Sequence, residues 1–203
     1  MTDSRTGRLI KISRSDLPVV VSNKSSGGTT VSATSLIANR CGIDIFVTGG
    51  IGGVHRGVEQ TFDISADLTE LGRTPIAVIC AGVKSILDIP KTLEFLETQG
   101  VCVMVFNGDK INGNKVEFPA FFTRKSGSNI SYNIETEEKA AKVILERKKL
   151  GIDSGIVIAV PIPEENQSIG ESVNRAINEA LNEVKYIYSY NYISIKNIKY
   201  RIF

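Results

Sequence analysis

Three uninterrupted apolar runs alternate with helical stretches along this chain. They are TPIAVICAG at 74–82, VCVMVF at 101–106 and GIVIAVPIP at 155–163. A strand that is apolar at every position is typical of a parallel sheet covered on both faces, because neither side of such a strand meets water. The alternation therefore predicts an α/β fold of three layers, α/β/α, around a mostly parallel or mixed sheet.

Shorter patterns predict the remaining elements. Strands are expected where β-branched residues cluster, at 9–13, 17–22 and 44–49. Helices are expected where apolar residues recur with helical spacing, at 29–42, 85–100, 135–151 and 171–184. Ser85 is the expected N-cap of the second helix, and Gly42 suits the left-handed position after the first. In such folds, ligands bind at the loops that follow the strands.

The composition excludes several classes of function. The 203 residues suffice for one α/β core, and 42% hydrophobic and 23% charged residues are ordinary globular values. A net charge of +2 gives no reason to expect nucleic acid or a membrane surface as a partner. No apolar run is long enough to cross a bilayer. The three cysteines lie among apolar residues without metal-type spacing, which indicates buried thiols in a reducing, cytoplasmic compartment.

The last segment, KYIYSYNYISIKNIKYRIF at 185–203, differs from everything before it. It contains five of the six tyrosines and four basic residues, with no acid, glycine or proline. It alternates weakly, as an exposed edge strand would. We therefore divide the chain into a domain at 1–184 and an atypical tail at 185–203. Translation beyond a missed splice site is our hypothesis for the tail, which an uninterrupted transcript across this junction would contradict.

The stretch FVTGGIGGVHRG at 46–57 is the first candidate site. It is not a P-loop, because no Gly-Lys-Ser/Thr follows, and it is not a dinucleotide fingerprint, because His55 stands where the third glycine would be. A strand followed by glycines, with His55 and Arg56 alongside, suits an anion such as a phosphate monoester. A tight structural turn with a packed histidine is the equal alternative. The turn SGGTT at 26–30, just before a helix, is a second possible anion site.

The acidic run TFDISAD at 61–67 is the second candidate site. Asp63 and Asp67 are four residues apart and share a face of either a strand or a helix, and Ser65 joins them if the segment is a strand. Two carboxylates and a hydroxyl suit a hard divalent cation that keeps several waters. In the alternative, Asp67 caps a helix and Asp63 is solvated.

Lys84 is the third candidate. It follows a buried strand within AVICAGVKSILDI, where desolvation would favour a neutral, nucleophilic amine able to form a Schiff base with a sugar aldehyde. A lysine whose charged end reaches water beyond the strand end is the more common case. Lys11, in LIKIS, is either a phosphate contact or an edge-strand charge.

Together, these stretches resemble the successive blocks of one family. SRSDLPVVVSNKSSGGTTVSAT, FVTGGIGGVHRGVEQTFDISADLTEL, VICAGVKSILDIPKTLEFLETQGV, PAFFTR and GIVIAVPIPEE are similar, in order and spacing, to the pseudouridine-5′-phosphate glycosidases, also called pseudouridylate synthases or the indigoidine synthase A family. The resemblance extends from about residue 8 to residue 184. It implies cleavage of the C–C glycosidic bond of pseudouridine 5′-phosphate to uracil and ribose 5-phosphate, with Mn²⁺ as cofactor and a homotrimer as the assembly.

The resemblance also implies roles for individual residues. Lys84 corresponds to the nucleophile, which forms an imine at C1′ of the opened ribose. Asp63 corresponds to the metal-binding aspartate. Positions expected to contact the substrate correspond to Lys11, Val31, His55, Ser65, Ala66 and Asp67.

Two departures from the family pattern affect the expected activity. The family's N-terminal block ESTI, whose glutamate is the general acid, has no counterpart here, and neither does its C-terminal KSNI-like block. General acid catalysis typically contributes about 10²–10⁴-fold. The fold is therefore expected to be incomplete relative to the family, and the chain to be weakly active or inactive. The alternatives are a Schiff-base lyase for another sugar phosphate and a non-catalytic sugar-phosphate- or nucleotide-binding fragment or subunit.

Overall fold

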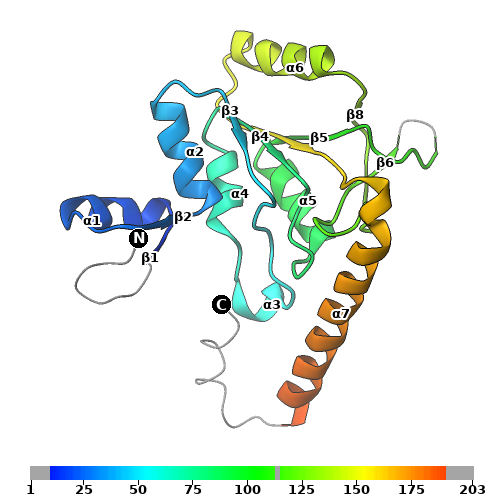
Figure 1. The fold of residues 1–203 in the computed structure, drawn as a ribbon. Coiled ribbons are helices and arrows are strands. Elements are labelled where there is room, and N and C mark those ends of the chain that lie inside the picture. The colour runs from blue at the N-terminus through cyan, green and yellow to red at the C-terminus, as the bar shows by residue number, and fades with distance from the viewer. Residues whose placement is uncertain (1–9, 113–114, 191–203) are drawn as a thin grey trace.

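The computed structural model describes residues 10–112 and 115–190, with side chains up to residue 183 (Figure 1). Its centre is a parallel five-stranded sheet in the order β3-β4-β9-β5-β8. The strands are β3 (Ile45–Val47), β4 (Ala77–Cys80), β5 (Cys102–Phe106), β8 (Asn133–Ile134) and β9 (Ile156–Ala159). The three apolar runs form the three inner strands of this sheet, which confirms the predicted α/β class.

Helices cover both faces of the sheet. On one face, α4 (Ala66–Leu71) and α5 (Ile89–Thr98) pack on β4 and β5, and α2 (Val31–Arg40) packs against α4. On the opposite face, α6 (Glu137–Lys149) covers β5, β8 and β9 (Figure 1). The β9 strand is buried at every position because it lies at the centre of the sheet and meets helices on both sides.

Two small sheets complete the strand pairing. β1 (Ile10–Ile12) and β2 (Gly27–Thr29) are parallel, and β6 (Val116–Glu117) and β7 (Asn129–Ile130) are antiparallel. The short helices are η1 (Arg14–Asp16), α1 (Leu17–Ser22), α3 (Val58–Thr61) and η2 (Glu164–Asn166). In Figure 1, β1, β2 and α1 lie to one side of the main sheet, next to α2 and α4.

The expected strand at 17–22 is wrong, because this segment is helix α1. The Ser13 N–H donates to the Asp16 carboxylate as the chain turns into η1, and Pro18 in the first turn of α1 has a backbone angle suited to a helix start. The apolar residues mislead here because they remain outside the core: Val19 is 60% and Val21 is 71% exposed.

The expected start of the next long helix is also wrong. α5 begins at Ile89, and its N-cap is Asp88, whose side chain accepts a hydrogen bond from the Lys91 N–H. Ser85 instead donates to the carbonyl of Ala120. By contrast, Gly42 follows α2 with a φ of 76°, as predicted.

The cysteine prediction is only partly right. Cys80 is buried and Cys102 is half-buried, but Cys41 is exposed, because it follows α2 at the outer end of that helix.

The last described helix, α7 (Gln167–Tyr190), crosses the expected boundary at residue 184. Residues 185–190 are thus helical and do not form the expected edge strand. The rest of the proposed tail, 191–203, lies outside the described residues. None of the helices in the described ranges is both long and apolar enough to cross a membrane.

Candidate active site

A cavity of about 770 Å³ lies at the carboxyl ends of β3 and β4, where the sequence predicted ligand binding. Its walls come from β1 and η1, the start of α2, the glycine loop, the segment before α4 and the segment after β4. All eight residues singled out from the sequence line it: Lys11, Val31, His55, Asp63, Ser65, Ala66, Asp67 and Lys84. The structure therefore brings together side chains that are up to 73 positions apart, while their roles stay predictions.

The glycine loop packs against protein on its inner side. A Cβ atom on Gly52 would lie 2.2 Å from Ser65 Oγ, and one on Gly53 would lie 2.5 Å from Thr92 Oγ1. These glycines permit close contact with the start of α4 and with α5, which no larger residue would allow. The glycine density thus reflects close packing of the loop that forms one cavity wall.

Four of the nine N–H groups in residues 49–57 already have hydrogen-bond partners within the protein. The amides of Ile51 and His55 donate to the carbonyls of Gly82 and Asp63. The amide of Gly52 donates to the Asp67 carboxylate, and that of Val54 donates to Thr92 Oγ1. Arg56 also points elsewhere, because its Nη2 lies 3.3 Å from the Ser85 carbonyl and the residue does not line the cavity. The side of the loop that contains Gly52 and Val54 thus has a structural role, while the choice between an anion site and a turn stays a prediction for the other amides.

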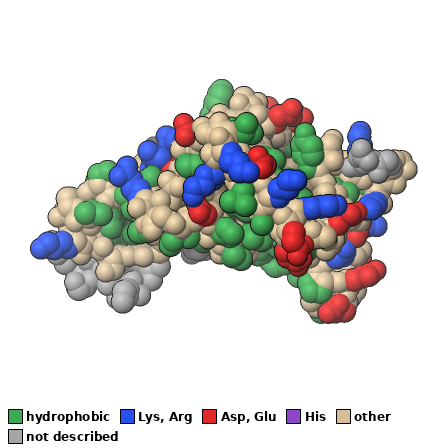
Figure 2. All heavy atoms as spheres, turned by 90° about the horizontal axis from the view of Figure 1, so that it is seen from above, with side chains coloured by type: hydrophobic (Ala, Val, Ile, Leu, Met, Phe, Trp, Pro, Cys, Tyr) green, Lys and Arg blue, Asp and Glu red, His purple; other side chains and the backbone are tan. Residues whose placement is uncertain are grey.

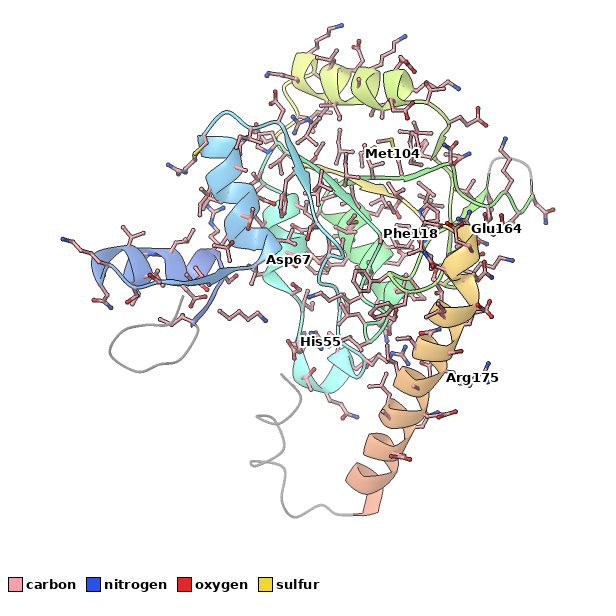
Figure 3. All side chains as sticks on the ribbon, viewed as in Figure 1. His55, Asp67, Met104, Phe118, Glu164 and Arg175 are labelled. Carbon is pink, nitrogen blue, oxygen red and sulfur yellow. The ribbon has the colours of Figure 1, made fainter. Side chains whose placement is uncertain are left out.

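Ser65 and Asp67 have separate structural tasks. Ser65 is the N-cap of α4, and its hydroxyl accepts a hydrogen bond from the Asp67 N–H. The Asp67 carboxylate is 6% exposed; its two oxygens accept hydrogen bonds from Ser32 N at 2.8 Å and Gly52 N at 2.9 Å. In Figure 3, Asp67 accordingly lies between α2 and α4. Asp67 therefore does not cap the helix, because Ser65 provides the cap, whereas the other part of that alternative, an exposed Asp63, is confirmed.

Asp63 is the carboxylate that is open to the cavity. Its side chain is 53% exposed, and Oδ2 lies 4.0 Å from Nδ1 of His55, which Figure 3 shows above α3. It forms no side-chain hydrogen bond with another described residue. No group of three His, Cys, Asp or Glu side chains within the described ranges could hold a metal together. Asp63 fits an ion that keeps most of its waters, while both oxygens of Asp67 already accept hydrogen bonds from backbone amides.

Lys84 projects into the cavity from the segment that follows β4. Its backbone N–H donates to the Ile51 carbonyl, and its neighbours Val83 and Ser85 are buried, whereas Lys84 itself is exposed. The desolvation expected from the apolar sequence around it is thus absent, because alternate residues of this segment face opposite ways. Within the described ranges, its amine forms no ion pair.

The start of α2 and the end of β1 form the opposite wall. Val31 is the first residue of α2, and its N–H has no hydrogen-bond partner among the described residues. Lys11 is exposed on β1, and Ser13 follows it, with a buried hydroxyl oxygen that has no partner in the described part of the chain. Sequence reasoning missed Ser13, because a serine in a polar turn carries no distinguishing signal.

Comparison with known proteins identifies the family of this chain. The family model described as indigoidine synthase A like protein matches residues 1–188. The chain belongs to this family. It is 57% identical over 157 residues to a pseudouridine-5′-phosphate glycosidase of Caldanaerobacter subterraneus subsp. tengcongensis, covering 77% of this chain and 49% of that protein. The corresponding protein of Arabidopsis thaliana is 54% identical over 155 residues, with 76% and 45% covered.

Two solved structures of this fold are similar to the chain. An indigoidine synthase A-like protein of Thermotoga maritima superimposes with a TM-score of 0.74 at 35% identity, over 84% of this chain and 55% of that one. The prealnumycin C-glycosynthase AlnA, solved in complex with ribulose 5-phosphate, gives a TM-score of 0.79 at 34% identity, over 89% and 57%. The chain therefore spans about half the length of the relatives that it matches.

Proposed function

We propose that this chain carries the nucleophile-bearing part of a pseudouridine-5′-phosphate glycosidase site. The observation that supports this most is the meeting of Lys84 and Asp63 in one cavity, opposite the N–H of Val31, which has no hydrogen-bond partner among the described residues. The names of the relatives at more than 50% identity supply the substrate, pseudouridine 5′-phosphate. The sugar-phosphate complex of AlnA is consistent with a sugar phosphate in this cavity.

The proposed orientation puts the phosphate at the wall formed by α2 and β1. The first N–H of a helix suits an anion, and the Ser13 hydroxyl and the Lys11 amine lie on the same wall. With the phosphate at this wall, C1′ of the ribose lies at the other end of the cavity, near Lys84 and Asp63. His55 lies next to Asp63 at the same end.

The proposed reaction begins with attack of the Lys84 Nζ on C1′, which opens the ribose ring as the C1′–O bond breaks. The electron pair of the C1′–C5 bond then passes to uracil, which takes up a proton, while nitrogen and C1′ form an iminium. Water hydrolyses the iminium, releasing ribose 5-phosphate and restoring the amine. A manganese ion held by Asp63 and water would supply positive charge near the substrate.

We expect this chain to react slowly. Lys84 is exposed, so burial does not help to activate its amine. The described residues around the cavity also include no glutamate, whereas the resemblance implies a glutamate as general acid. The manganese ion, the imine and a homotrimer all remain predictions for this protein.

Trapping of the imine tests the proposal. The chain is incubated with pseudouridine 5′-phosphate and MnCl₂, reduced with borohydride and digested, and uracil is measured in parallel. We expect a pentose-phosphate adduct on the Lys84 peptide, and neither adduct nor uracil with Lys84→Met. Lys142→Met, which removes an exposed lysine from α6 on the opposite face, is the matched control and should behave like the parent chain. Ligand binding that survives Lys84→Met, with no adduct in the parent chain, would support the non-catalytic alternative instead.

A further inference from the structure

A buried carboxylate joins two walls of the cavity from behind. Glu70 lies on α4, the helix that begins next to Ser65, and its side chain is completely inaccessible to water. Removing a carboxylate from water is costly unless charged partners surround it. The partners of Glu70 therefore reveal what this residue holds in place.

Two arginines and a threonine contact the Glu70 carboxylate. Arg14 Nη1 lies 2.7 Å from Oε1, and Arg73 Nη2 lies 3.2 Å from Oε2. The hydroxyl of Thr74 also donates to Oε1. Arg73 and Thr74 follow α4 directly, but Arg14 comes from η1, 56 positions earlier. The Arg14 contact is thus the long-range link of the cluster.

Arg14 belongs to a turn whose conformation is set locally. The Ser13 N–H donates to the Asp16 carboxylate at 2.7 Å, and the Asp16 N–H donates to the Ser13 carbonyl at 3.1 Å. Ser13 and Ser15 of this turn, and Lys11 just before it, line the cavity, while Arg14 does not. Alternate residues of the turn therefore face the cavity and Glu70. The contact between Arg14 and Glu70 thus holds in place the turn that carries Ser13 and Ser15.

This link is important because β1 and η1 lie outside the five-stranded sheet. β1 pairs only with the short strand β2 among the described strands, and both lie to the side of α2 and α4 (Figure 1). The position of β1 and η1 relative to α4 depends on few contacts. The hydrogen bond from Arg14 to the buried Glu70 carboxylate is among the stronger of these, because both groups are charged.

We propose that Arg14 and Glu70 form a positioning pair that sets the affinity of the cavity for a sugar phosphate, by holding Lys11 and Ser13 opposite the start of α4. This inference rests on the proposed function for the identity of the ligand. Neither residue touches the ligand. Groups that orient the ligands of a metal typically change its affinity about 10–100-fold when removed, and we expect an effect at the lower end of this range here.

The two arginines of the cluster provide a matched pair of variants. Arg14→Ala and Arg73→Ala each remove one guanidinium from the same carboxylate, and their side chains are similarly exposed, at 36% and 47%. Only Arg14 lies on the turn that carries the cavity-lining residues Ser13 and Ser15. We expect the dissociation constant for ribose 5-phosphate, measured by calorimetry on the full chain, to rise about tenfold with Arg14→Ala and less than twofold with Arg73→Ala. Arg14→Lys, which keeps the charge, should restore part of the affinity.

Hydrogen exchange separates this inference from the proposed function. Without any ligand, Arg14→Ala should raise amide exchange in residues 10–16 selectively, while Arg73→Ala should not. Equal effects of the two variants on affinity or on exchange would overturn the positioning role and reduce Glu70 to a general stabilising residue. Failure of the parent chain to bind ribose 5-phosphate, with selective exchange in Arg14→Ala, would overturn the proposed ligand and with it the affinity claim.

Discussion

At the scale of single residues, the cavity depends on groups that bind the protein and not the ligand. The Asp67 carboxylate joins the first turn of α2 to the glycine loop through the amides of Ser32 and Gly52. A buried carboxylate that accepts two N–H groups is well compensated, and removing either donor leaves it short of a partner. The spacing between Asp67 and Asp63 suggested two carboxylates around one metal ion, but both oxygens of Asp67 already accept hydrogen bonds from backbone amides.

Gly52→Ala should distort this wall of the cavity. The new methyl group would lie 2.2 Å from Ser65 Oγ and 2.7 Å from Asp67 Oδ2, so that the loop or the start of α4 must move. Overpacking of this kind costs about 1–3 kcal/mol. We expect urea unfolding to show such a loss of stability, and calorimetry to show a loss of sugar-phosphate affinity.

Gly100→Ala is the control, because an added methyl group at this glycine contacts no other atom. Gly100 follows α5 with a φ of 69°, and a methyl group there would meet nothing within 4 Å. The left-handed conformation should cost about 1–2 kcal/mol without changing affinity. An equal loss of affinity in both variants would show that stability alone controls binding.

The three cysteines should differ in reactivity. Burial raises the pKa of Cys80 to about 11, although the Gly82 N–H offsets part of the shift, and burial also raises the pKa of Cys102. At pH 8 about one thousandth of a thiol with a pKa of 11 is in the reactive thiolate form. Iodoacetamide should therefore modify exposed Cys41 first, Cys102 slowly and Cys80 only after unfolding in urea, as peptide mass spectrometry would show. Rapid labelling of Cys80 in the folded chain would contradict its burial.

At the scale of elements, helix ends were harder to predict than helices. Ser85 was the expected cap of α5, but Asp88 takes the role. The Asp88 N–H donates to the Val54 carbonyl, which holds Asp88 beside the glycine loop at the point where the helix starts. The start of α5 is thus set by a contact 34 positions away in the sequence.

Asp88→Ala should destabilise α5. The side chain of Asp88 accepts hydrogen bonds from the backbone N–H and from the amine of Lys91. Loss of such a cap costs about 1 kcal/mol, and Asp88→Asn should retain most of the capping contribution. Urea unfolding at pH 7 measures the free energies of unfolding of the parent chain and both variants.

The pH dependence of this contribution has a definite sign. Burial alone would raise the pKa of Asp88, but the hydrogen bonds from Lys91 and the charges of Lys91 and Arg56 lower it overall. A carboxyl whose pKa is lower in the folded state stabilises the protein above its unfolded pKa and loses this contribution as the pH falls through the folded value. The difference in free energy of unfolding between the parent chain and Asp88→Ala should therefore be largest at pH 7 and shrink below about pH 4. A stability difference that grows in acid would contradict a lowered pKa for Asp88.

At the scale of the whole molecule, the core is unequally covered. β4, β9 and β5 lie inside the sheet, whereas β3 forms an edge at which Ile45 is 47% and Val47 is 68% exposed. Figure 2, which views the molecule from the side of α6, shows exposed apolar side chains among the charged ones. Stability should therefore concentrate in the inner strands.

Substitutions in an inner strand and at the edge should differ accordingly. Ile158 of β9 is 2% exposed, and Ile158→Ala should lower the free energy of unfolding by about 2–5 kcal/mol, since it leaves a cavity in the core. Val47→Ala, at the exposed edge, should change it by no more than about 0.5 kcal/mol. Urea titrations of both variants provide the measurement. A large loss with Val47→Ala would indicate that another surface covers β3 in solution.

The sequence alone determined the α/β class, because three strands that are apolar on both faces can only be buried between layers. The residues expected at the site, several of them from the resemblance to the family, all line the same cavity, although Ser13 was not among them. Tertiary structure decided which groups remain available to a ligand. The Gly52 amide and the Asp67 carboxylate bind each other within the protein and Lys84 is exposed, because hydrogen-bond partners and burial depend on segments far away along the chain.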